Sequence, residues 1–199
     1  MPKIAPPNTP RLSSTALRKL SEPFNIDRIK HPLLLVGIRG YYSNTMGLPG
    51  TNDRGIYDDA LFIDSPNGTV SYNANTDPSR FRPGYGNLQP TKGMAMLKPG
   101  LWLSYQFGIH KTYPALIQTG GIVTVMRDGH PDYEDTGFFG INIHKGGYKT
   151  TSSLGCQTVH PDQWPSFISL ATSEAKRISA LGFKKLIIPY LLLQQLKLP

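Results

Sequence analysis

The chain of 199 residues carries 21 Lys and Arg against 13 Asp and Glu, with 20 Gly, 18 Pro and one cysteine. This length suits one domain with a core that needs no metal or disulfide, and a single cysteine excludes an internal disulfide. No apolar run approaches the roughly 18 residues of a membrane-spanning helix, and the first residues lack the apolar segment of a signal peptide. We therefore expect a turn-rich globular protein without a transmembrane segment.

The net charge of +8 is concentrated at the two ends of the chain. Residues 1–30 hold six basic and two acidic side chains, residues 176–199 hold five and none, and the middle nets −1. Basic ends suit anionic envelope surfaces and other polyanions, or simply keep the surface solvated. Because the near-neutral middle has no nucleic-acid-binding motif, we expect no nucleic-acid partner.

The first 30 residues predict an arm, and residues 31–199 predict a single domain. The arm is rich in proline and polar residues and holds one short helix, capped by Ser13 or Ser14 and continuing through TALRKL. The domain begins with HPLLLVGIRGYY, which predicts a buried strand from Leu33 to Ile38. ALFI and TVSYNA flank a Ser-Pro-Asn-Gly turn and predict a hairpin.

Further short strands follow, then one long helix. MAMLKPGLWLSYQFGI and PALIQTGGIVTVMRDG each predict two extended segments, and FFGINIH predicts a strand that ends at His144. Asp162 can cap a helix over about 162–181, whose apolar residues repeat at i, i+3 and i+4. KKLIIPYLLL predicts a terminal strand at a sheet edge, where Pro189 is tolerated best. The fold class expected is mostly β, a sandwich or barrel with one main helix late in the chain.

The only cysteine, Cys156, lies in GINIHKGGYKTTSSLGCQTVHP and is the candidate nucleophile. A nucleophilic thiol needs a base within hydrogen-bond reach and N–H donors for the oxyanion that forms. His144 stands twelve residues earlier, at a strand end, and the small, glycine-bearing residues between them can fold back. Gly155 would let backbone N–H groups approach a substrate. Two alternatives stay open at this point: an inert buried thiol, and His160 as the base.

IHKGGYKTTSSLGCQTV resembles the active-site signature of the L,D-transpeptidase (YkuD-like) family. The family pattern is a histidine at an IHG-like strand end, a loop, and then Ser-His-Gly-Cys. Position by position, the residues that match are His144, Ser153, Gly155 and Cys156. The resemblance implies that the backbone carbonyl of Lys145 orients the imidazole. Leu154 replaces the signature's second histidine, and the arginine that usually follows the cysteine is missing.

The resemblance implies a mostly-β fold and cysteine-dependent acyl transfer on peptidoglycan stem peptides. The departures from the signature, and the unmatched segment from Arg39 to Arg127, favour a specialised hydrolytic member of the L,D-carboxypeptidase or endopeptidase type. A phage lysin or a delivered effector would act in this way in the bacterial envelope or periplasm. A transpeptidase that forms cross-links or exchanges D-amino acids, and a non-catalytic cell-wall-binding module, are the alternatives.

Three further residues are candidates for substrate binding: Ser153 in the signature, Arg39 at the end of the first strand, and Tyr41. Arg39 could present its guanidinium to a stem-peptide carboxylate, although a buried ion pair would explain it equally well. Tyr41 could belong to an aromatic wall, or fill a half-buried strand position. No pair of histidines has metal-ligand spacing and no second cysteine is present, so we expect neither a metal nor a cofactor.

Overall fold

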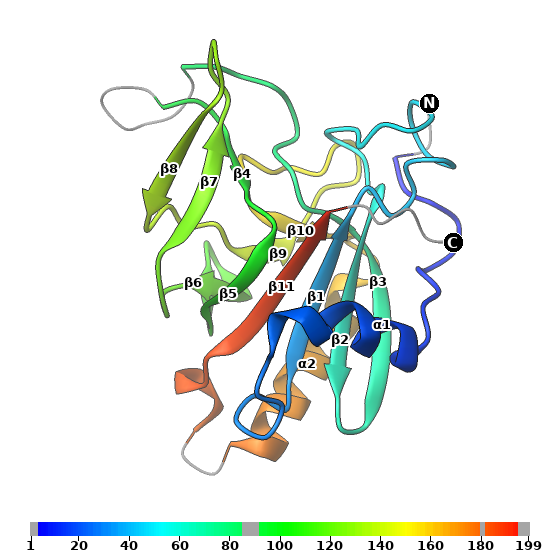
Figure 1. The fold of residues 1–199 in the computed structure, drawn as a ribbon, viewed down its shortest axis with the longest axis vertical. Helices are drawn as coiled ribbons and strands as arrows, with labels where there is room; N and C mark the ends of the chain where they lie inside the picture. Colours follow the sequence, from blue (N-terminus) through cyan, green and yellow to red (C-terminus); the bar gives the residue numbers. More distant parts are fainter. Residues whose placement is uncertain (1–3, 85–91, 180–181, 195–199) are drawn as a thin grey trace.

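The computed structural model describes residues 4–84, 92–179 and 182–194, and it is mostly β (Figure 1). The strands are β1 (Leu34–Arg39), β2 (Asp59–Ser65), β3 (Gly68–Asn75), β4 (Ala95–Leu97), β5 (Gly100–His110), β6 (Tyr113–Gln118), β7 (Val123–Arg127), β8 (Tyr133–Gly137), β9 (Ile143–Lys145), β10 (Gln157–Val159) and β11 (Ile188–Gln194). The helices are α1 (Ser14–Ser21), η1 (Glu22–Phe24), α2 (Trp164–Ile178) and η2 (Phe183–Lys185). The predicted fold class, with its late main helix and short N-terminal helix, is confirmed.

Eight strands close a barrel in the order β1-β11-β5-β6-β9-β10-β3-β2, and β4-β7-β8 form a separate three-stranded sheet. Figure 1 shows this smaller sheet beside one end of the barrel. The predicted hairpin is confirmed as β2 and β3, which pair from Asp59↔Ala74 to Ser65↔Gly68. The segments of MAMLKPGLWLSYQFGI are β4 and β5, but they belong to different sheets. The sequence did not predict β8 or β10.

Two apolar clusters lie on opposite faces of the strands β1, β2 and β11. Leu35, Leu61 and Tyr190 face the main core, which α2 completes. Val36 and Phe62, on the other face, belong to a second cluster that includes Leu17 of α1. Burial on both faces explains why these strands read as continuous apolar runs and not as alternating ones.

The terminal strand is not at a sheet edge, which corrects the expectation for Pro189. β11 lies between β1 and β5 in the closed barrel. Its register with β5 shifts where Ile188 pairs with Tyr105 but Tyr190 pairs with Trp102. Proline has no N–H to donate, and such an irregularity is the other place where a strand tolerates it.

The main helix begins later than predicted, and its cap differs. Gln163 occupies the N-cap position without a side-chain hydrogen bond, whereas the Asp162 carboxylate accepts a hydrogen bond from the Tyr148 hydroxyl at 2.7 Å. The helix ends at Ile178. Residues 180–181, which the prediction included, lie outside the described residues. No helix of the described ranges has both the length and the apolar character needed to cross a membrane.

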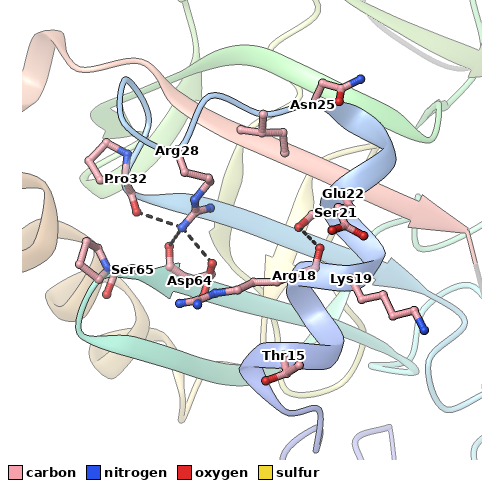
Figure 2. Close-up of a pocket in the computed structure, with 12 residues that line it drawn as sticks. Thr15, Arg18, Lys19, Ser21, Glu22, Asn25, Arg28, Pro32, Asp64 and Ser65 are labelled. Atoms are coloured by element: carbon pink, nitrogen blue, oxygen red, sulfur yellow. Dashed lines mark hydrogen bonds and ion pairs between the residues drawn. The ribbon is translucent and has the colours of Figure 1, made fainter.

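The N-terminal arm packs on the barrel through α1 and the segment that follows it. Ser13 caps α1 as predicted, because its hydroxyl accepts the N–H of Ala16 at 3.1 Å. Figure 2 shows the cleft between this arm and the barrel, of about 790 Å³. There Arg28 donates to the Pro32 carbonyl at 3.1 Å and to the Asp64 carboxylate at 2.8 Å, which ties the arm to the β2–β3 hairpin.

Candidate active site

Two short parallel strands bring the cysteine and the histidine to one pocket. β9 and β10 pair in the register Ile143↔Gln157 and His144↔Thr158. The loop that leaves β9 therefore returns beside it, and it places Cys156, just before β10, next to Asn142, just before β9. Cys156 and His144 both line a pocket of about 310 Å³. The cleft at the arm is larger, but neither of these groups lines it.

The thiol of Cys156 is half-buried and held by two backbone groups. Its S–H donates to the Gly140 carbonyl at 3.3 Å, and its sulfur accepts the N–H of Asn142 at 3.4 Å. Burial raises the pKa of Cys156 to about 11, although the Asn142 N–H and the charge of Lys111 act in the opposite direction. The side chain of Cys156 is therefore a protonated thiol at neutral pH.

His144 is buried and is held in one tautomer. Its Nδ1 lies 2.7 Å from the backbone carbonyl of Lys145. Because a carbonyl can only accept, Nδ1 carries the proton and Nε2 presents a lone pair. The Tyr113 hydroxyl lies 3.4 Å from the same carbonyl and donates to it. Burial lowers the pKa of His144 to about 4, so the imidazole is neutral at physiological pH and can accept a proton.

Ser153 and Gly155 shape the loop that carries the cysteine. Ser153 is 1% exposed; its hydroxyl donates to the Cys156 carbonyl at 2.7 Å and accepts the N–H of Gly155 at 3.0 Å. The Ser153 hydroxyl is thus engaged within the loop, and its predicted contact with substrate stays a prediction. The Gly155 N–H donates to this hydroxyl and is therefore not free in this conformation, and its expected part as oxyanion donor stays a prediction. The N–H of Cys156 itself donates to no acceptor among the described residues.

The requirement for glycine at position 155 has a different cause. Its φ is +149°, and a Cβ there would lie 2.2 Å from the Ala95 carbonyl oxygen of β4. Only a residue without a side chain lets the cysteine loop pass this close to the smaller sheet.

The pocket carries positive charge. Lys92, Lys111 and Arg127 line it, and none of its lining residues within the described ranges is acidic. Asp135 pairs with two of these cations, Lys92 at 3.0 Å and Arg127 at 3.2 Å. Lys111 is exposed in the two-residue turn between β5 and β6, with φ +55°, and has no ion-pair partner among the described residues. It is the cation best placed to meet an anionic ligand.

Arg39 and Tyr41, expected at the substrate, lie elsewhere. Arg39 is 2% exposed and pairs with Asp77 at 2.9 Å; it also donates to the carbonyls of Thr76 and Leu97. The alternative of a buried ion pair is therefore correct. The hydroxyl of Tyr41 exchanges hydrogen bonds with the backbone of Arg11 in the arm. Neither residue lines the cysteine pocket.

Two residues of the site have no signal in the sequence. His110 lines the pocket and stacks on His144 with ring centroids 4.1 Å apart. Asn142 contacts both His110 and Cys156. By contrast, His160 does not line the pocket; its ring packs on Tyr57. The sequence separation from Cys156, four residues for His160 and 46 for His110, favours the histidine that lies outside the pocket.

Within the parts of the chain that the structure describes, no group of three or more His, Cys, Asp or Glu side chains is arranged to hold a metal ion. Comparison of the chain with known proteins finds no matching family model, no matching curated protein and no matching solved structure.

Proposed function

We propose that this protein is a cysteine-dependent acyl-transfer enzyme that acts on peptidoglycan stem peptides, with water as the usual acceptor. The observation that carries the proposal is that a neutral thiol, Cys156, and a neutral imidazole, His144, line the same pocket. Nε2 of His144 carries no proton, because the proton is on Nδ1. A thiol nucleophile and a general base are the two groups that acyl transfer requires. The signature-like stretch around Cys156 supports the stem peptide as substrate.

The reaction proceeds in two halves. Sγ of Cys156 attacks the carbonyl carbon of the L-residue while its proton passes to Nε2 of His144, which gives a tetrahedral oxyanion. Collapse of this species expels the amine of the D-residue, which takes the proton from the imidazolium, and leaves a thioester on Cys156. Water then attacks the thioester with His144 as base, and the thiol is released.

The charge of the pocket supports a substrate with a free carboxylate. A stem peptide ends in a carboxylate, and an exposed Lys111 at the pocket wall can pair with it. Binding at the terminal residue would make the enzyme an L,D-carboxypeptidase, with the bacterial envelope as its place of action. Cross-link formation or D-amino-acid exchange differs only in the acceptor, an amine in place of water.

The test is mass spectrometry of purified stem peptides and muropeptides incubated with wild type and Cys156→Ser. Loss of the terminal D-residue in wild type alone supports hydrolysis, and a mass gain from an added amine would identify transpeptidation. His144→Asn should abolish turnover, whereas His160→Asn, the matched histidine outside the pocket, should leave it intact. Binding of the peptide without any product, equal in wild type and Cys156→Ala, would identify a binding module and overturn the enzyme.

A further inference from the structure

A second histidine, His110, stands beside the proposed base. It is the last residue of β5, and its ring is parallel to that of His144, with an interplanar angle of 7°. Both rings line the same pocket as Cys156. The proposed mechanism above gives this imidazole no part.

The hydrogen bonds of Asn142 determine which nitrogen of His110 carries the proton. The Asn142 side-chain oxygen accepts the N–H of Gln118 at 2.9 Å, so the other terminal atom is the NH₂ group. This NH₂ lies 3.1 Å from Nδ1 of His110. Since NH₂ can only donate, Nδ1 accepts, and the neutral ring of His110 must carry its proton on Nε2.

The two stacked rings are thus held in opposite tautomers. His144 has its proton on Nδ1 and a lone pair on Nε2, which makes it a base; His110 has its proton on Nε2, which makes it a donor. Burial and the nearby charge of Lys111 lower the pKa of His110, and so favour the neutral form that this bond needs.

The site also lacks a donor that the chemistry requires. A tetrahedral intermediate needs hydrogen-bond donors at its oxyanion, commonly two. The Gly155 N–H is taken by Ser153, which leaves the N–H of Cys156.

We propose that His110 is a second catalytic histidine, whose Nε2–H donates to the oxygen of the attacked carbonyl together with the N–H of Cys156. The inference rests on the proposed function. It adds an electrophilic group that comes from the β5–β6 hairpin and not from the loop that carries the cysteine. Asn142 is its positioning residue, because it fixes the tautomer.

A pair of variants separates a donor from a packing ring. His110→Phe keeps a flat ring against His144 but removes the N–H, whereas His110→Gln loses the ring and keeps an amide donor. With a stem tetrapeptide as substrate, we expect His110→Phe to lower kcat by about 10²–10³-fold at a nearly unchanged KM. His110→Gln should keep more of kcat than His110→Phe. The reverse order would show that the ring acts by packing and would overturn the proposal.

Asn142→Asp tests the tautomer directly. The new carboxylate can still accept the N–H of Gln118, but its second oxygen must receive a proton from Nδ1, which leaves Nε2 of His110 without one. ¹⁵N NMR of the histidine rings should show the proton of His110 on Nε2 in wild type and on Nδ1 in the variant, with kcat reduced as in His110→Phe. A wild-type proton on Nδ1 would overturn the inference whatever the activity.

The outcomes also separate this inference from the function on which it rests. Wild-type protein that leaves every stem peptide unchanged would overturn the proposed function itself. Wild-type activity that His110→Phe retains in full would overturn the role of His110 alone.

Discussion

Replacing Gly155 by alanine should lower kcat/KM because it displaces Cys156. The new Cβ would lie 2.2 Å from the Ala95 carbonyl oxygen, whereas carbon and oxygen pack no closer than about 3.3 Å. The loop or β4 must therefore move by about 1 Å, and a misplacement of this size in an active site can cost about 100-fold in rate. The φ of +149° adds backbone strain of about 1–3 kcal/mol.

Gly68→Ala is the matched control for this prediction. Gly68 also has a positive φ, +121°, but lies in the β2–β3 hairpin, where an added Cβ meets no atom within 4 Å. Both variants should lose stability in chemical denaturation, and only Gly155→Ala should lose kcat/KM on a stem tetrapeptide. A Gly155→Ala enzyme that works within about twofold of wild type would refute the argument that this close approach positions the thiol.

Three further predictions concern charge. Arg39→Met should cost about 3–5 kcal/mol of unfolding free energy in denaturant titrations, because Asp77 is left buried without its partner; a raised KM with unchanged stability would instead restore a substrate role. Turnover should fall as the pH drops through about 4, where His144 gains a proton and ceases to be a base, and a pH profile that declines already near 6.5 would contradict this. Lys111→Met should raise the KM for a peptide with a free carboxylate and leave the KM for the amidated peptide unchanged. Because the charge of Lys111 lowers the pKa of Cys156, pH-dependent alkylation should show a higher pKa for Cys156 in this variant than in wild type.

Much of the fold could be predicted because it follows from local patterns. The hairpin of β2 and β3 has a strong turn signal, and the apolar runs of β1 and β11 are long enough to predict strands at once. Period-2 alternation even points Arg39 inward, since it shares a face with Leu35 of the main core. The sequence could not supply its partner Asp77, which is brought to it by the β2–β3 hairpin.

The site was predictable only where its parts are close in sequence. His144 and Cys156 are joined by one loop, so a short return of the chain suffices to bring them together. The contact between His110 and His144 depends on β5, β6 and β9 lying side by side in the barrel, an order that no local pattern encodes. The same holds for Pro189, whose tolerance depends on a register shift against a strand more than 80 residues away.

The neutral state of the thiol and the imidazole determines what else the site must provide. With the pKa of Cys156 at about 11 and that of His144 at about 4, moving the proton between them costs roughly 10 kcal/mol at 1.36 kcal/mol per pH unit. Attraction between two unit charges near a protein surface returns only about 4 kcal/mol even at a separation of 4 Å, which does not offset this cost. A standing ion pair is therefore disfavoured, and the proton must leave as the sulfur attacks. In the proposed reaction, negative charge then develops on the substrate oxygen, and a donor such as the Nε2–H of His110 would matter more than in an enzyme that rests as a thiolate.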